Sequence, residues 1–105
     1  MSVSTHVLDS VTGRPATGMV VALYAGDRLL AEGSTDADGR CRLAEGPTGA
    51  GTHRLVFGTG PWTAAAGRDT FYPEVVLTFT VAEPDAHHHV PLLLAPYGYS
   101  TYRGS

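Results

Sequence analysis

The feature that most constrains the fold is a series of short runs in which apolar and polar residues alternate, each ended by Gly, Pro or Asp. Alternation with a period of two places successive side chains on opposite faces, as in a β-strand that buries one face. The clearest run is 75–81, which is rich in β-branched and aromatic residues. Short alternating runs that are separated by turn residues in this way are typical of an all-β sandwich or barrel.

The same pattern predicts the other elements. We expect further strands at 6–8, 19–24, 28–34, 40–43, 52–57 and 87–94, joined by turns at 9–15, 25–27, 36–39 and 82–86 and by a loop at 45–51. After a break at 58–61, residues 62–68 form the one helix-friendly stretch, and we predict a short helix there. Pro91 indicates a sheet edge or a bulge in the last run.

Several polar and aromatic residues have an ordinary structural interpretation. Alternation places Arg40 and Arg42 on one face of their strand and Cys41 and Leu43 on the other. We expect a solvated position for Arg42 and Arg54, a structural or surface position for His53, core or helix packing for Trp62 and Tyr72, and turn formation for Asp9.

Composition excludes several classes of function. A length of 105 residues with 43% hydrophobic content predicts one folded domain, 1–105. The net charge is −3, and all seven basic residues are Arg, without the basic surplus of a nucleic-acid-binding protein. No apolar run reaches the length of a membrane span, and residues 1–6 lack the pattern of a secretory signal. Together with the single cysteine, Cys41, these features predict a cytoplasmic protein with neither membrane nor nucleic-acid partners.

Five histidines occur in the chain, three of them consecutive at 87–89. On a strand, His87 and His89 share a face and His88 points to the other. A metal site would use His87, His89 and His6, but only Asp85 is a nearby acidic ligand, so we predict no metal. The alternative to a functional role is that the three histidines form a solvated strand end.

The C-terminal segment is unusual for a chain end. Residues 95–105 hold three Tyr, one Arg and several hydroxyls, whereas chain ends are commonly polar and frayed. This composition indicates a tail that is packed or used. Taken in isolation, the final Gly104 and Ser105 would also suit a cloning scar.

Segments across the whole chain resemble the 5-hydroxyisourate hydrolase family, the enzymatic relatives of transthyretin. They are residues 4–9 with 12–16, then 35–40, 71–74, and 87–94 running into 97–105. The resemblance implies a transthyretin-like β-sandwich of seven to eight strands with one short helix. It implies a homotetramer with active sites in a channel between dimers. The implied reaction is hydrolytic ring opening of 5-hydroxyisourate to 2-oxo-4-hydroxy-4-carboxy-5-ureidoimidazoline in urate degradation, with water and no cofactor.

The same resemblance assigns site residues. The family's catalytic set falls on His6, Arg40 and His89, and its terminal tetrapeptide, the most specific element of the match, falls on Tyr102, Arg103, Gly104 and Ser105. Two departures stand out: His88 occupies a position where the family usually has Tyr, and Ala95 one where many members have Ser. By alternation His88 faces away from His89, so we expect the site to be intact.

These residues suit the chemistry. Hydrolysis of a ring amide needs a base for water, an acid for the departing nitrogen and positive charge where the oxyanion develops. We expect His6 and His89 to share the two proton-transfer roles, in an order that the sequence leaves open. Arg40 would meet the carbonyl edge of the substrate. Arg103 would bind substrate, with Tyr102 and Gly104 beside it, and Ser105 would relay a proton or orient a histidine.

Two other functions remain open at this point. A non-catalytic transthyretin-like carrier of small planar ligands would use the same channel but would not need two His and an Arg in it. A β-sandwich interaction module would account for the Gly- and Asp-rich turns but not for the histidines or the tail.

Overall fold

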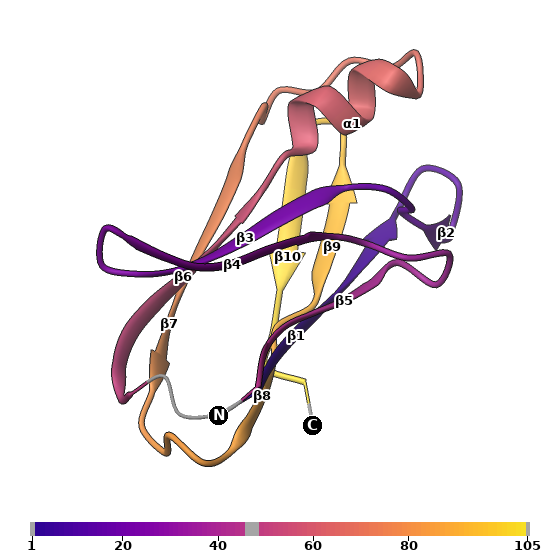
Figure 1. The fold of residues 1–105 in the computed structure, drawn as a ribbon. Helices are drawn as coiled ribbons and strands as arrows, with labels where there is room; N and C mark the ends of the chain where they lie inside the picture. The colour runs from indigo at the N-terminus through magenta and orange to yellow at the C-terminus, as the bar shows by residue number, and fades with distance from the viewer. Residues whose placement is uncertain (1, 46–48, 105) are drawn as a thin grey trace.

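The computed structural model describes residues 2–45 and 49–104. Within them the chain forms two facing β-sheets, with a helix at one end of the sandwich and β8 at the other (Figure 1). In chain order the elements are β1 (Ser2–Asp9), β2 (Arg14–Pro15), β3 (Val20–Ala25), β4 (Arg28–Ser34), β5 (Arg40–Glu45), β6 (Gly51–Phe57), α1 (Thr59–Ala65), β7 (Val75–Val81), β8 (His87–His89), β9 (Leu92–Ala95) and β10 (Gly98–Thr101).

Strand β1 is the centre of the first sheet. Among the described residues this sheet has six strands in the order β10-β9-β1-β2, with β5 and β8 also paired to β1. β5 runs antiparallel to β1, whereas β8 and β9 run parallel to it. The run 87–95 is split because Pro91 has no N–H to donate. The split is a gap in the pairing rather than a bulge, because β8 and β9 keep the same register with β1 on both sides of Pro91. The N–H of Val90 still donates to the carbonyl of Ser4 at 2.9 Å.

The second sheet is antiparallel throughout. Its described strands follow the order β4-β3-β6-β7. The predicted hairpin between β3 and β4 turns through Gly26, whose φ of +59° is a left-handed conformation that glycine adopts without strain. The core lies between the two sheets, with Val3 and Val7 from β1 facing Leu23, Leu55 and Phe57, all fully buried. Burial of each such side chain contributes about 1.5–3 kcal/mol.

The predicted β-sandwich with one short helix is confirmed. The described ranges hold ten strand segments rather than seven or eight, because β2 is a two-residue pairing, the last predicted run is divided into β8 and β9, and β10 forms in a segment where no strand was predicted. β1 begins at Ser2 rather than at His6, and β5 and β6 extend into the predicted loop 45–51. Of that loop, 46–48 lie outside the described residues.

The predicted position of the helix is wrong by about one turn, because α1 spans Thr59–Ala65 rather than 62–68. The predicted break at 58–61 contributes the first helical turn. Pro61 is tolerated there because an N–H in the first turn has no partner within the helix. Gly67, at φ +70°, follows the end of the helix. No helix of the described residues is long and apolar enough to cross a membrane.

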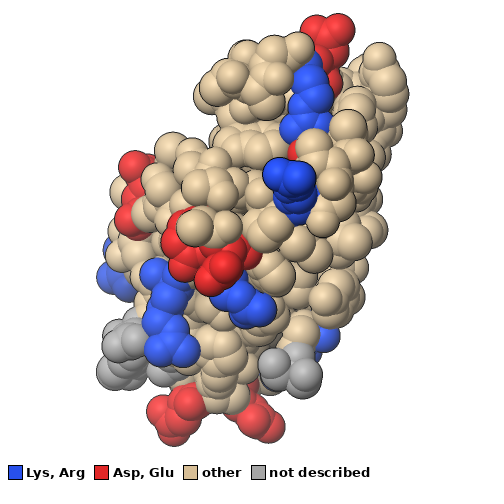
Figure 2. Space-filling view, turned by 90° about the vertical axis from the view of Figure 1, so that its right-hand side faces the viewer, with Lys and Arg blue, Asp and Glu red and all other residues tan. Residues whose placement is uncertain are grey.

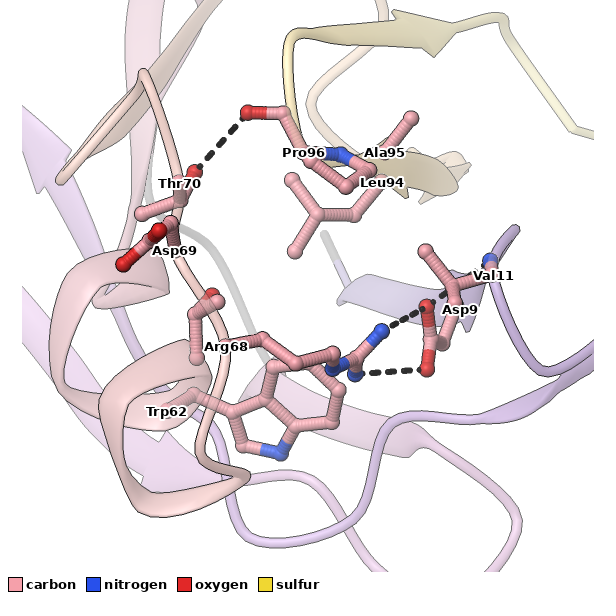
Figure 3. Close-up of a pocket in the computed structure, with 10 residues that line it drawn as sticks. Asp9, Val11, Trp62, Arg68, Asp69, Thr70, Leu94, Ala95 and Pro96 are labelled. Atoms are coloured by element: carbon pink, nitrogen blue, oxygen red, sulfur yellow. Dashed lines mark hydrogen bonds and ion pairs between the residues drawn. The ribbon is translucent and has the colours of Figure 1, made fainter.

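An ion pair fixes the segment after α1 to β1. Arg68 donates to both carboxylate oxygens of Asp9, at 3.2 and 2.8 Å, and its guanidinium lies over the ring of Trp62, 5.4 Å from the centroid (Figure 3). Asp9 also accepts from the N–H of Val11 and the hydroxyl of Thr12, as predicted for a turn residue. The space between these side chains is about 10 Å³, so the cluster is a structural clasp rather than a ligand site.

Arg54 is half-buried rather than fully solvated: its guanidinium donates to the carbonyl of Gly26 at 2.9 Å and lies over the ring of Tyr24. His53 is buried, with Nδ1 donating to the carbonyl of Gly51 at 3.1 Å, and Trp62 and Tyr72 pack against the core. On the face drawn in Figure 2, basic and acidic side chains of the described residues lie interspersed, without a continuous basic stripe.

Candidate active site

The candidate site lies on the outer face of β1. Along this strand, burial alternates without exception from Ser2 to Asp9, so that Ser2, Ser4 and His6 point outward while Val3, Thr5 and Val7 point into the core. Ser2, Ser4 and His6 therefore form a polar row on the outer surface, whereas Thr5 and Asp9 are buried on the other face. The same strand supplies both the core and the site.

Strand register brings the other site residues beside this row. Across the antiparallel pair with β5, His6 lies opposite Arg40 and Ser4 opposite Arg42. Across the parallel pair with β8, Ser4 lies beside His89 and Ser2 beside His87. Neighbouring side chains on one face of a sheet lie about 4.5–5.5 Å apart at Cβ. The register therefore groups His6, Arg40 and His89, as expected from the sequence.

The turn before β5 fixes the start of the strand that carries Arg40. A carboxylate oxygen of Asp36 accepts from the N–H groups of Asp38 and Arg40, each at 2.9 Å. The hydrogen bond from the N–H of Arg40 lowers the pKa of Asp36 more than any other interaction does. Gly39 completes the turn at φ +76°, where a Cβ would overlap the carbonyl oxygen of Val7 at 2.5 Å. Arg40 itself is exposed on the outer face.

His89, like His6, is a half-buried imidazole of the site. Its Nδ1 lies 2.8 Å from the hydroxyl oxygen of Ser4, so Nε2 is the ring nitrogen that Ser4 does not contact. Partial burial is the largest cause that lowers the pKa of His89 below 6.5. The positive charge of Arg40 and the charges of His87 and His6 lower it further, whereas a hydrogen bond with Ser4 raises it. The neutral form is therefore favoured.

The C-terminal tail returns to this histidine. After β10, the N–H of Gly104 donates to the carbonyl oxygen of His89 at 2.8 Å. The hydroxyl of Thr101 donates to the carbonyl of Pro91 at 2.7 Å. The backbone of the tail is thus held against β8 and the segment after it, while the side chains of Tyr97, Tyr99 and Tyr102 are exposed. Ser105 lies outside the described residues.

Two hollows meet at His89. The first, of about 350 Å³, is lined by Ser4, Thr5, Asp36, Arg40, Cys41, Arg42, His87 and His89. The second, of about 390 Å³, lies along β7 and is lined in part by His89, Tyr102 and Arg103. The structure therefore places Arg40 and His89 in one hollow, with His6 beside Arg40, whereas exposed Tyr102 and Arg103 line the other.

Two residues near the site were not assigned a role from the sequence. Ser4 contacts His89 directly, and His87 was considered only as a metal ligand or as part of a solvated strand end. The alternation of β1 was the available signal, because it places Ser4 on the face of His6. His88 points inward and is buried, as predicted, and its Nδ1 donates to the carbonyl of Ala86. No three His, Cys, Asp or Glu side chains in 2–45 and 49–104 group as a metal site.

Fold and site together define a class of protein: a transthyretin-like β-sandwich that carries imidazoles and a guanidinium on the outer face of one sheet. A family model described as the HIUase/Transthyretin family matches residues 3–104. The chain belongs to this family.

Similar proteins agree with this assignment. The chain is 49% identical to 5-hydroxyisourate hydrolase 2 of Rhizobium meliloti over 97% of this chain and 94% of that one. It superposes on the structure of Klebsiella pneumoniae 5-hydroxyisourate hydrolase with a TM-score of 0.92 and 40% identity over 100% of both chains. Sea bream transthyretin in complex with thyroxine gives a TM-score of 0.85 and 28% identity, over 97% of this chain and 93% of that one.

Proposed function

We propose that this protein is a 5-hydroxyisourate hydrolase, which opens the six-membered ring of its substrate with water and without a cofactor. The observation that carries the proposal is the pairing of His89 with Arg40 in one hollow of about 350 Å³. A half-buried imidazole that favours its neutral form lies there beside the guanidinium of Arg40.

In the proposed mechanism His89 is the base. Its Nε2 takes a proton from a water molecule, and the resulting hydroxide attacks the ring carbonyl. Arg40 stabilises the negative charge that develops on the carbonyl oxygen. His6, opposite Arg40 in the sheet, donates a proton to the departing ring nitrogen. The product carries a carboxylate in place of the ring amide.

The tail is proposed to complete the substrate site. Gly104 holds the backbone of the tail against His89 through its N–H. Arg103 and Tyr102 line the adjoining hollow and are proposed to bind the substrate's carbonyl edges. Ser105, outside the described residues, is proposed to orient a histidine through its hydroxyl or the terminal carboxylate.

A homotetramer is proposed as the working assembly, with sites in a channel between dimers. The outer strands β7 and β10 each present an edge without a further strand in the described chain, and such edges favour pairing with another copy. We further propose that residues 1–105 act as a single domain in the cytoplasm.

An ultraviolet time course tests the function. 5-Hydroxyisourate is generated from urate with urate oxidase, and its decay is followed with and without the protein. Acceleration by the wild type that both His89→Ala and Arg40→Ala lose supports the hydrolase and its site. Decay at the spontaneous rate throughout would contradict the proposal and favour the carrier of small planar ligands, which ligand-binding measurements would then address.

A further inference from the structure

A row of alternating hydroxyl and imidazole groups runs along the edge where β1 meets β8. The hydroxyl of Ser2 hydrogen-bonds to Nδ1 of His87. Nε2 of His87 lies 3.0 Å from the hydroxyl oxygen of Ser4, which in turn lies 2.8 Å from Nδ1 of His89. The row leads from the half-buried His89 to His87, which is exposed.

The two histidine rings are held in a matched orientation. They lie 6.4 Å apart between centroids, with an interplanar angle of 15°. The hydroxyl of Ser4 sits between a nitrogen of each ring. Parallel register of β1 and β8 imposes this arrangement, because Ser2 pairs with His87 and Ser4 with His89.

A hydroxyl group between two imidazole nitrogens can be oriented in two ways, because it has one proton to donate and lone pairs to accept. In the first orientation Ser4 donates to His89 and accepts from Nε2 of His87, so neutral His89 carries its proton on Nε2. In the second, Ser4 accepts from Nδ1 of His89 and donates to His87, so Nε2 of His89 is free to act as a base. Reversal of the row exchanges these two tautomers of His89.

We propose that Ser4 and His87 are positioning residues that form a proton relay between His89 and solvent, which resets the base after each turnover. The inference deepens the proposed hydrolase function and rests on it. Neither residue needs to touch the substrate, since each acts through the Nδ1 side of His89.

The proton balance of the relay is simple. When Nε2 of His89 takes a proton from water, the ring holds two. Its Nδ1 proton then passes to the oxygen of Ser4, whose own proton passes to Nε2 of His87. His89 is then a neutral ring with its proton on Nε2, and His87, now protonated on both nitrogens, loses its Nδ1 proton toward Ser2 and bulk water. The base is regenerated when Nε2 of His89 releases its proton to water and the row reverses: His87 regains a proton at Nδ1 from solvent, its Nε2 proton passes to Ser4, and the proton of Ser4 passes to Nδ1 of His89.

The charges around His89 favour outward movement of the proton. Arg40 and Arg42 on β5 and Arg103 on the tail are positive, and His6 on β1 is a further titratable neighbour. Asp36 provides a negative charge at the turn before β5, where it is held by backbone N–H groups. A second proton on His89 is therefore opposed by its cationic neighbours, whereas His87 meets bulk water directly.

The experiment removes the exposed end of the relay and replaces it from solution. Turnover of 5-hydroxyisourate is measured for the wild type, His87→Ala and His87→Gln at low buffer concentration, with and without added imidazole, across pH. We expect kcat of both variants to fall by about tenfold or more, within the range of general acid–base contributions. Added imidazole should restore His87→Ala and leave the wild type unchanged, and KM should stay near its original value.

Ser4 provides the second test. Ser4→Ala should lower kcat and should not respond to imidazole, because the break lies inside the row, whereas Ser4→Thr keeps a hydroxyl and should retain most of the activity. Ser100→Ala, on the exposed part of β10, is the matched control and should behave as the wild type. Circular dichroism verifies that each variant is folded.

The outcomes separate the two proposals. If the wild type fails to accelerate decay, the hydrolase function falls and the relay falls with it. If the wild type is active but folded His87→Ala keeps full turnover at low buffer, or gains nothing from imidazole, the relay alone is overturned. A rise in KM without a fall in kcat would likewise overturn it, because that pattern indicates a role in substrate binding.

Discussion

Gly104 lies directly against the imidazole of His89. Its N–H donates to the carbonyl oxygen of His89 at 2.8 Å, and a Cβ built on Gly104 would overlap Cδ2 of the ring and lie 3.1 Å from Cγ. The tail therefore contacts His89 with bare backbone, which permits an approach that no other residue allows. The ring is held between Ser4 on one side and the tail on the other.

Gly104→Ala is expected to displace His89 or the tail and to lower kcat/KM by about 10²-fold, because a shift of about 1 Å at a site can cost that much. Gly98→Ala is the control, since a Cβ on this β10 residue meets nothing within 4 Å. Both variants should remain folded. Equal activity of the two would contradict the importance of the close contact.

Arg40→Lys is expected to lower kcat by about 10²–10³-fold, because an ammonium lacks the planar fork that meets a developing oxyanion. Arg40 is exposed and its loss should leave stability nearly unchanged, so thermal unfolding serves as the control measurement. Arg14→Lys, at an exposed position in β2, is the matched substitution and should keep full activity.

The pH dependence of kcat/KM should report the lowered pKa of His89. Since the base must be neutral, activity is lost as pH falls through a value below 6.5, the ordinary pKa of histidine. Arg40→Gln removes a positive neighbour and should move this acid limb to higher pH. An acid limb that stays in place, or lies above 6.5 in the wild type, would argue against His89 as the base.

The Asp9–Arg68 clasp is expected to matter for stability rather than catalysis. Arg68→Leu leaves the buried carboxylate of Asp9 without its cation and should lower the free energy of unfolding by about 1–3 kcal/mol. Denaturant titration measures the loss. Asp69→Asn, next in the chain and exposed, is the control and should unfold like the wild type.

The same clasp predicts a direction for acid unfolding. Burial raises the pKa of Asp9, but hydrogen bonds from Arg68, Val11 and Thr12 and the charge of Arg68 outweigh it and lower the pKa overall. The stabilisation is therefore present above the pKa of the unfolded chain and is lost as pH falls through the lower folded value. Between the pKa of Asp9 in the unfolded chain and its lower value in the folded chain, the free energy of unfolding should therefore fall less for Arg68→Leu than for the wild type.

Much of the fold could be predicted because its signals are local. Alternation and β-branched content identified β6 and β7, and the Asp36 turn followed from side-chain hydrogen bonding to nearby backbone. The start of α1 could not be predicted, because Gly60 and Pro61 disfavour a helix interior but are harmless in a first turn. The Asp9–Arg68 pair was missed because it joins residues 59 positions apart.

In the candidate site, too, some features could be predicted from the sequence and others depend on contacts between distant segments. Resemblance named His6, Arg40 and His89, and alternation accounts for their shared face once β1, β5 and β8 are known to be neighbours. The contact of Ser4 with both His87 and His89 depends on a parallel pairing across 83 and 85 positions, which no local pattern encodes.

The strict alternation of β1 limits how this sheet can vary. A substitution at an outward position changes the surface and leaves the hydrophobic interior untouched, so the chemistry can be altered one side chain at a time. Deletion of a single residue between Ser4 and His6 would instead invert every position on one side of the gap, turning polar groups inward and aliphatic ones outward. Members that keep the activity should therefore tolerate length changes in turns and almost none within this strand.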